Sequence, residues 1–328
     1  MWFSGFCRSK NVCAKVVAGL IGLAVSCACP AQMPSVFPRG TVKIVVTLPP
    51  GGATDLIARE IAKGLQDIWG QSVVVENKPG ASGIIGTESV VRAAPDGHTL
   101  LLISSTAIVA TPFLYEKMPY NALVDLKPIS MVAAIPNVLV VSPSMKAGSL
   151  KEFIAVAKVN PGAVNYATSG KGESNHIAME ILQRASDTRL TEVPYKGGAP
   201  AVLAVLSGDV QASWLAVSTA LPHLKAGKLV ALAVSSVERA PLLPNVPSVV
   251  EAGYSAFEAA FVVGIFLPAG VNPLLASKIQ ADVQAVARTS AYRDRILATG
   301  NIAMASSADE FAKLLQFDTV RYKSILAP

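Results

Sequence analysis

The sequence predicts an α/β protein built on mainly parallel sheets, and two observations carry this prediction. Short runs rich in β-branched residues alternate with segments whose apolar residues recur at helical spacing, which is the pattern of α/β folds. The first run is apolar except for Lys43 and Thr47, as in a strand covered on both faces. The predicted strands are 42–48, 72–77, 98–104, 138–142, 164–168, 190–194, 229–235 and 261–267.

The size and composition of the chain fit a large folded core. Its 328 residues are 52% hydrophobic, so it has enough apolar material for one or two domains of ordinary size. No fixed-period repeat or low-complexity tract interrupts it. We therefore expect a folded protein and not a disordered one.

The N-terminus resembles a secretory leader. Arg8, Lys10 and Lys15 precede an apolar run that ends among small residues near Cys29. The run is shorter than the roughly 20 residues of a membrane-spanning helix, and no comparable run follows it. We expect residues 1–31 to be a signal peptide, cut after Ala28 or Ala31, so that the mature protein is soluble and exported. Lipoprotein anchoring at Cys27 is the less favoured alternative.

Cysteine usage excludes some kinds of site, and the distribution of charge argues against some kinds of partner. All four cysteines (Cys7, Cys13, Cys27 and Cys29) fall in the leader, so the folded body cannot hold a disulfide framework or a cysteine metal site. Without the leader, 25 basic and 22 acidic residues remain, and the formal charge falls from +6 to +3. The basic residues are scattered, which argues against nucleic acid and anionic membranes as partners.

The turn "PPGGATD", which follows the first strand, is a candidate anion site. Ile57, Ile61, Leu65 and Ile68 recur on one face of the helix after it, so the turn joins a central strand to a packed helix. Gly51 and Gly52 leave room beside Pro50, and the first amides of a helix lack partners and carry its positive dipole end. Asp55 can instead cap those amides, and an ordinary strand-to-helix turn is an equal alternative.

Hydroxyl-bearing turns follow other strands. Ser104, Ser105 and Thr106 can donate hydrogen bonds to a carboxylate or cap a helix. Ser169, Gly170 and Ser174 repeat that arrangement in the second half of the chain, and Ser218 with Thr219 offers another strand-end pair. Lys171 is more consistent with a solvated loop tip than with a ligand contact.

Two other features are better explained by packing. Gly80, Gly83 and Gly86 fit neither a Walker A motif nor a dinucleotide fingerprint, so tight helix–sheet contact is the favoured interpretation. Tyr195, before Gly197 and Gly198, is more safely assigned to the core than to a ligand pocket.

An enzyme is the competing class. The sequence has no G-x-S-x-G elbow, no S-x-x-K, and three widely separated histidines. His176 lies near Ser169 and Ser174, but a structural histidine at a helix start is the favoured interpretation. No spacing typical of metal ligands occurs. We therefore expect no enzymatic activity, no catalytic residues, no metal and no cofactor.

Several motifs together resemble a known family. "PPGGATDLIAR", "VVENKPGASGIIGTESVVRAAPDGHTLL", "NPGAVNYATSGKGESNHIAMEIL", "VPYKGGAPAVLAVLSGDV" and "GIFLPAGVNP" resemble, in order and spacing, the Bug/TctC family of periplasmic solute receptors for tripartite tricarboxylate transporters. The resemblance extends from Val42 to the C-terminus. Leu48, Thr111 and His98 depart from the family pattern, the first two at positions that bear on ligand identity.

The resemblance implies a type II periplasmic-binding-protein fold, in which two α/β domains are joined by two crossing strands. A break at Pro136 and a loop around Tyr254 to Phe257 place domain 1 at 32–136 and 257–328 and domain 2 at 137–256. The resemblance further implies a monomeric receptor that closes by a hinge on a small carboxylate in an interdomain cleft. The receptor would deliver this carboxylate to membrane transporter subunits. A receptor that feeds a membrane sensor kinase is the alternative, and a hydrolase using the same cleft is a further one.

The resemblance also implies the class of ligand and the site. The ligand would be a dicarboxylate, a tricarboxylate, an acidic amino acid or an aromatic acid, held mainly by backbone amides and hydroxyls. The expected ligand-binding residues are Pro50, Gly51, Gly52, Asp55, Ser104, Ser105, Thr106, Ser169, Gly170, Ser174 and Ser218.

Overall fold

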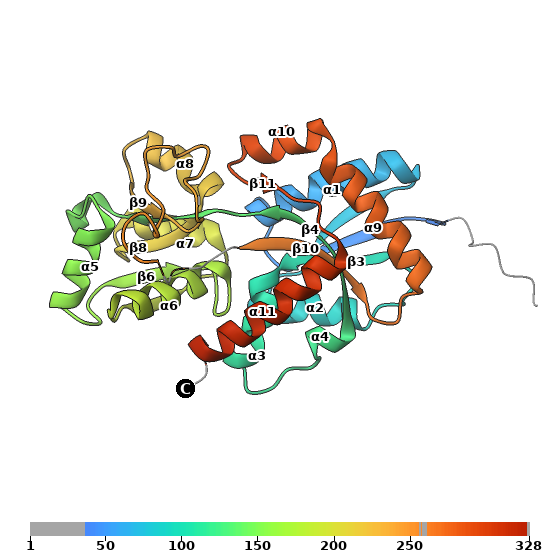
Figure 1. Cartoon of the computed structure of the whole chain (residues 1–328), viewed down its shortest axis with the longest axis horizontal. Helices are drawn as coiled ribbons and strands as arrows, with labels where there is room; N and C mark the ends of the chain where they lie inside the picture. The colour runs from blue at the N-terminus through green and yellow to red at the C-terminus, as the bar shows by residue number, and fades with distance from the viewer. Residues whose placement is uncertain (1–36, 256, 258–260, 327–328) are drawn as a thin grey trace, which may run out of the picture. The chain divides into compact units, whose positions relative to one another are not determined.

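Strands and helices alternate along the chain, and the strands form two sheets (Figure 1). The computed structural model describes residues 37–255, 257 and 261–326. The expected leader and its cysteines lie outside the described residues. Both sheets belong to one compact unit that begins at Pro38. No helix in the described ranges has the length and apolar character needed to cross a bilayer.

The first sheet has six strands. In spatial order they are β11 (Ile302–Ala303), β4 (Leu126–Ala134), β10 (Val262–Pro268), β3 (Thr99–Ser104), β1 (Val42–Val46) and β2 (Val73–Asn77). One face carries α1 (Ala53–Trp69), α9 (Pro273–Arg288) and α10 (Ser290–Ala298). The other carries the short helix η1 (Ala81–Gly83), α2 (Ile84–Val91), α3 (Ser105–Leu114), α4 (Ala122–Asp125) and α11 (Ala308–Leu326), as Figure 1 shows.

The second sheet has five strands. Their order is β7 (Thr191–Pro194), β6 (Asn165–Thr168), β8 (Ala212–Ala216), β5 (Asn137–Val141) and β9 (Val230–Val234). The helices of this part of the chain are η2 (Pro143–Met145), α5 (Leu150–Val159), α6 (Ser174–Ser186), α7 (Gly198–Ser207) and α8 (Val217–Lys225).

Both sheets are mixed, whereas the strand pattern predicts mainly parallel ones. β1 runs parallel to β2 and β3, but β10 runs antiparallel to β3 and β4; β5 likewise opposes β8 and β9. The register gives the reason. Val262, the first residue of β10, pairs with Ala134, the last of β4, and Asn137 at the start of β5 pairs with Ala216 at the end of β8. A strand that arrives from the other sheet begins at the edge where its neighbours end, and therefore runs against them.

The chain passes between the sheets where the sequence places a break. β4 ends at Ala134 and β5 begins at Asn137, so residues 135–136 connect one sheet to the other. The return connection runs from β9 to β10, and residues 256 and 258–260 within it lie outside the described residues. The domain limits at 136/137 and 256/257 stay a prediction.

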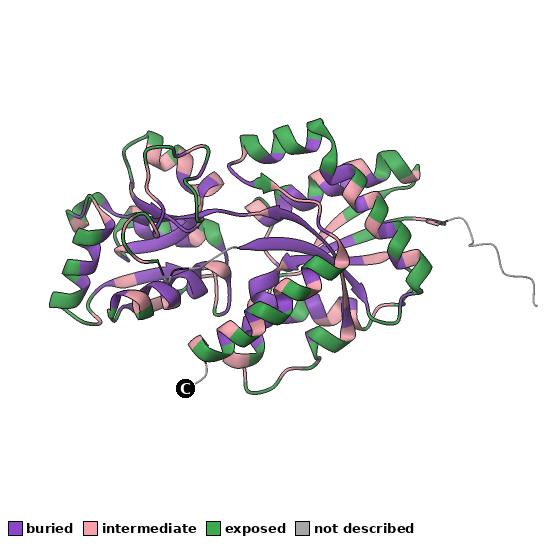
Figure 2. Cartoon of the chain, in the orientation of Figure 1, coloured by how far each residue is buried: buried purple, intermediate pink, exposed green. Residues whose placement is uncertain are grey.

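Strand β1 and helix α1 carry the turn of most interest, and both are firmly packed. Val42, Ile44, Val45 and Val46 are buried, as expected for a strand covered on both faces (Figure 2). Ile57, Ile61 and Leu65 of α1 are also buried. The inclusion of Ile68 in that apolar face is wrong: it is 45% exposed. It lies in the last turn of α1 and lines a surface hollow with residues of α10 instead of meeting the sheet.

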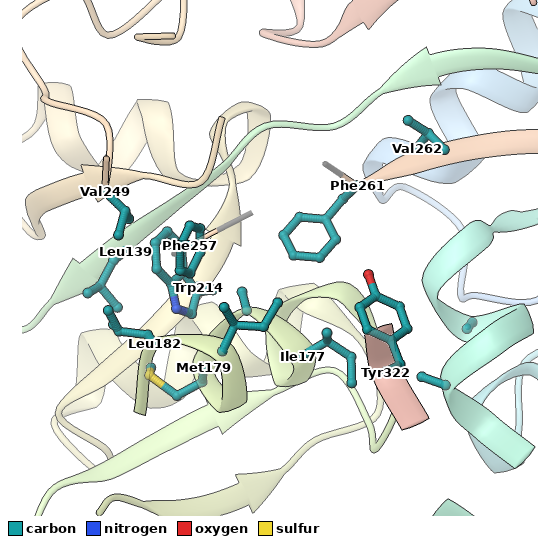
Figure 3. Close-up of a cluster of buried hydrophobic side chains, with 14 of the residues drawn as sticks. Leu139, Ile177, Met179, Leu182, Trp214, Val249, Phe257, Phe261, Val262 and Tyr322 are labelled. Carbon is teal, nitrogen blue, oxygen red and sulfur yellow. The ribbon is translucent and has the colours of Figure 1, made fainter. Parts of the chain in front are cut away.

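One apolar cluster contains residues of both sheets (Figure 3). Trp214 of β8 stacks on Phe257 with ring centroids 5.6 Å apart. Phe261 lies beside them, and Tyr322 of α11 approaches it from the other side, near Ile177 of α6 (Figure 3). Burial of these large side chains stabilises the fold by roughly 1.5–3 kcal/mol each. It also makes a firm apolar base for the cavity described below.

Candidate ligand site

A cavity of about 290 Å³ lies where strands of both sheets end. Its wall is formed by residues 48–54 after β1, 104 at the end of β3, 169 and 173–175 after β6, 196–200 after β7, and 214–216 with 219 at the end of β8. Residues 135, 137 and 261–263 of the connections between the sheets complete it. This is the usual position of a ligand in open α/β folds, the crevice beyond the carboxyl ends of strands.

The turn after β1 is held by Asp55. The Asp55 carboxylate accepts hydrogen bonds from Gly51 N–H at 3.0 Å, from Arg59 at 2.9 and 3.0 Å, and from Asn77 Nδ2 at 3.0 Å. Burial acts to raise the pKa of Asp55, but these hydrogen bonds outweigh it and lower the pKa below its ordinary value. Asp55 thus occupies the Gly51 amide and fixes the turn from behind.

The next amides remain open for a ligand. Gly52 is the N-cap of α1 and receives no side-chain cap. Gly52, Ala53 and Thr54 donate no main-chain hydrogen bond to any described residue, and all three line the cavity. An added Cβ at Gly52 would meet nothing within 4 Å. The start of α1 therefore presents N–H groups and positive dipole to the cavity, as an anion site requires.

The turn after β6 is ordered by Asn175. Its Oδ1 accepts hydrogen bonds from Ser169 N–H at 3.2 Å and from the Ser169 hydroxyl at 3.1 Å. Asn137 Nδ2 donates to the Ser174 hydroxyl at 3.3 Å, which links β5 to the start of α6. Ser174 and Asn175 donate no main-chain hydrogen bond within the described ranges, so α6 presents a second set of open amides.

The turn after β7 approaches the first turn closely. Gly197 has φ +104°, a conformation that favours glycine, and an added Cβ would lie 3.3 Å from the ring of Pro49. Lys196 lines the cavity but is exposed. Gly198 and Ala199 begin α7 and add further amides without a partner among the described residues.

The structure brings six of the residues expected from the sequence to the cavity. They are Pro50, Gly51, Gly52, Ser104, Ser169 and Ser174. Ser104 Oγ is buried and has no hydrogen-bond partner in the described part of the chain, so its hydrogen-bonding capacity is unused there. For all six, contact with a ligand stays a prediction.

The other expected residues lie off the wall. Asp55 is behind the turn, and Ser105 and Thr106 are fully buried in α3. Gly170 approaches Ser82 instead, where an added Cβ would lie 3.2 Å from the serine hydroxyl. Thr219 lines the cavity and Ser218 does not.

The glycine cluster and Tyr195, which the sequence analysis attributes to packing, are in close packing contacts. An added Cβ at Gly86 would lie 2.8 Å from the Lys78 carbonyl oxygen, so α2 approaches the sheet closely there. Tyr195 packs against a second apolar cluster, which includes Val205 of α7 and Leu215 of β8. Lys171 is exposed and does not line the cavity.

Glu173 is a wall residue that sequence reasoning missed. It is 4% exposed, and its Oε1 has no hydrogen-bond partner among the described residues. Burial raises the pKa of its carboxyl to about 7. Asn137, Trp214 and Phe261 were also missed. From the sequence, a glutamate in "GKGESN" is interpreted as a loop residue and the aromatic residues as core residues. Only their position beside the crevice in the structure identifies them as wall residues.

The histidine near these serines has structural partners. His176 Nδ1 accepts a hydrogen bond from Gly172 N–H at 3.3 Å, and its Nε2 faces Glu192 at 3.7 Å and Glu180 at 3.9 Å. Ser169 donates to Asn175 instead. No cluster of His, Cys, Asp or Glu suited to a metal occurs among the residues that the structure describes.

Comparison with known sequences finds one family. Residues 57–327 match the family model described as "Tripartite tricarboxylate transporter family receptor". The chain is 35% identical over 291 residues to Protein BugT of Bordetella pertussis, an alignment that covers 88% of this chain and 89% of that protein.

Solved structures share the fold. MatC from Rhodopseudomonas palustris, solved with bound malate, is 29% identical with a TM-score of 0.82, covering 88% of this chain and 100% of MatC. An R. palustris protein solved with adipate is 27% identical with a TM-score of 0.84, covering 88% and 97%. The expected α/β periplasmic-binding-protein fold is therefore confirmed.

Proposed function

The chain belongs to the tripartite tricarboxylate transporter receptor family, and from this premise we propose that it captures a small carboxylate and delivers it to a membrane transporter of that type. The family consists of periplasmic solute-binding proteins and is not enzymatic, so the chain is a solute receptor. The carboxylate, the delivery step and the closure mechanism are the proposed parts.

The open amides around the cavity are the observation that carries this proposal. Helices α1, α6 and α7 all begin at its wall, and their first N–H groups have no acceptor in the described ranges. Several positive helix ends that converge on one cavity favour an anion. Among the described wall residues, Lys196 carries the single basic side chain, and it is exposed. The main chain and hydroxyls would therefore supply most of the donors.

The relatives support a carboxylate in particular. MatC holds malate and the second R. palustris protein holds adipate. Both ligands are dicarboxylates of a size that a cavity of about 290 Å³ accommodates. We propose the same class for this chain, with Gly52, Ser104 and Ser169 among the contacts.

Closure around the ligand is the proposed mechanism. The wall combines turns from two sheets, which the chain connects at residues 135–136 and again between β9 and β10. A ligand that contacts turns of both sheets stabilises the arrangement in which they meet. We propose the division into 32–136 with 257–328 and 137–256 as the two bodies that move. Small-angle scattering should then give a smaller radius of gyration with ligand than without it.

We also propose that residues 1–31 direct export and are removed. The family is periplasmic, and the N-terminal pattern fits a signal peptide. The mass of the mature protein purified from the periplasm should correspond to a chain that begins at Cys29 or Gln32.

A thermal-shift screen of ligand-stripped protein tests the function. A dicarboxylate at about 100 times its Kd should raise the Tm by roughly 5 °C, whereas the matching diamide should not. Mass spectrometry should recover the acid unchanged, as expected of a receptor. If no mono-, di- or tricarboxylate in the panel raises the Tm, the proposed ligand class is wrong. Loss of uptake on gene deletion, with restoration by the intact gene, tests delivery to a transporter.

A further inference from the structure

Glu173 is the acidic side chain of the cavity. Among the described lining residues it carries the sole carboxyl group, and Lys196 carries the sole amine. A carboxyl group is an unexpected component of a wall whose other polar groups are suited to an anion. It lies in the turn between β6 and α6, beside the open amides of Ser174 and Asn175.

None of the described residues offers this carboxyl group a hydrogen-bond partner. Glu173 is 4% exposed, and its Oε1 is buried without a hydrogen bond within the described part of the chain. Glu173 is the N-cap residue of α6, yet its side chain does not cap that helix. A buried carboxyl group without a partner destabilises the protein, and no structural role observed here offsets that cost.

The charged groups on the surrounding elements are engaged elsewhere or exposed. On its own turn Lys171 is exposed, and on α6 the imidazole of His176 faces Glu180 and Glu192. Across the cavity Lys196 is exposed, and Asp55 behind the first turn is paired with Arg59. Consistent with this, burial is the one cause of the raised pKa of Glu173.

Resting on the proposed carboxylate receptor function, we propose that Glu173 selects a ligand that carries a protonated amine in addition to its carboxylate. The open amides and hydroxyls bind the anionic end, and the Glu173 carboxylate accepts hydrogen bonds from the ammonium group. A simple dicarboxylate would leave Glu173 unpaired and bring a second negative charge near it. The preferred ligands are therefore zwitterions of the amino dicarboxylate kind.

The proposal fixes the sign of the pH dependence. A nearby ammonium favours the ionised carboxyl, so binding releases a proton and affinity rises between pH 6 and pH 8. The opposite chemistry, a protonated Glu173 that donates to a ligand carboxylate, takes up a proton and gives an affinity that falls over the same range.

Matched ligand pairs provide the test. Calorimetric titrations of the full mature protein would compare succinate with aspartate, glutarate with glutamate, and adipate with 2-aminoadipate. We expect the amino acid of at least one pair to bind more tightly than its unsubstituted partner, and more tightly at pH 8 than at pH 6. Glu173→Gln should weaken that amino acid roughly 10- to 100-fold and leave the unsubstituted acid unchanged or tighter.

A second acid-to-amide variant controls for loss of charge alone. Glu88 lies on α2, outside the cavity wall, where it pairs with Arg92, and Glu88→Gln should leave both members of each pair unchanged. If Glu173→Gln fails to fold, the pH series on the unmodified protein still shows whether affinity rises or falls with pH. Binding of simple acids with no preference for the amine, or with affinity that falls as pH rises, overturns the role of Glu173 while the receptor function stands. Failure of every acid in the panel overturns both.

Discussion

Gly51 N–H donates a 3.0 Å hydrogen bond to Asp55, four residues along the chain, and the same carboxylate accepts bonds from Arg59 and Asn77. This arrangement fixes the turn between β1 and α1 from the side opposite the cavity. It also divides the amides of the turn: Gly51 is occupied by the protein, and Gly52 to Thr54 are left for a ligand.

Asp55→Asn should destabilise the protein by roughly 1–3 kcal/mol, because Arg59 and Gly51 N–H lose a charged acceptor. The folded state lowers the pKa of Asp55, so its stabilising effect is present above the ordinary pKa of an aspartate and is lost as pH falls through the lower folded pKa. Denaturant unfolding should therefore show a difference between the two proteins that is full at pH 7 and shrinks below pH 4. Asp67→Asn, an exposed change in the same helix, is the control and should change little at either pH. A difference of equal size at every pH would contradict the ionised role of Asp55.

Gly52→Val should weaken binding of the best carboxylate roughly tenfold or more, since about 1.4 kcal/mol of lost contact changes affinity by that factor. Gly52 has φ −81°, which valine tolerates, and its missing Cβ faces open space, so the Tm should change little. Gly51→Val is the contrasting variant, because φ +88° strains any β-branched residue and should lower the Tm. Calorimetry and thermal unfolding of both variants separate the two effects. Unchanged affinity in Gly52→Val would remove this turn from the site.

Glu173→Gln should stabilise the ligand-free protein at high pH. Folding raises the pKa of this carboxyl from its ordinary value to about 7, so the native state holds the proton more strongly and stability falls as pH rises between the two values. The glutamine side chain does not ionise, and the gain should approach about 3 kcal/mol at pH 8 and be small at pH 4. Thermal unfolding of both proteins across this range gives the measurement. A variant that is less stable at pH 8 would show that the ionised carboxyl has a partner.

Gly264→Ala should destabilise the fold by roughly 1–3 kcal/mol or more through overpacking. Gly264 lies in β10, and an added Cβ would overlap the ring of Phe311, which packs on Phe266 with a centroid distance of 4.8 Å. Gly40→Ala, where an added Cβ meets nothing within 4 Å, is the matched control. Chemical denaturation would measure both, and equal stability of the two variants would mean that Phe311 moves aside freely.

The predicted runs account for eight of the eleven strands in the described residues, because the signal of a strand is local, and they leave out β4, β8 and β11. Each predicted run from 42–48 to 261–267 contains or overlaps a strand, since β-branched apolar runs between turn residues have few other uses. Such local signals do not predict that β5 and β10 run antiparallel to their neighbours. Their direction depends on where the chain crosses between sheets, and the sequence marks only the first crossing clearly, at Pro136.

The candidate site is predicted in part for the same reason. Ser104 ends β3, Ser169 directly follows β6, and Gly52 lies in the turn between β1 and α1. Sequence position alone places such residues near the crevice. The direction of a side chain is a tertiary property. Ser105 follows Ser104 immediately but turns into α3, and Glu173 belongs to the wall because the whole turn folds against α3. No spacing in the sequence distinguishes these cases.

Strand β10 lies between β3 and β4 in the first sheet, although it comes near the end of the chain. During synthesis, β3 and β4 lack their shared neighbour until residues 262–268 leave the ribosome. The nascent chain therefore cannot reach its native core prematurely. The first sheet is complete only when this late strand joins it.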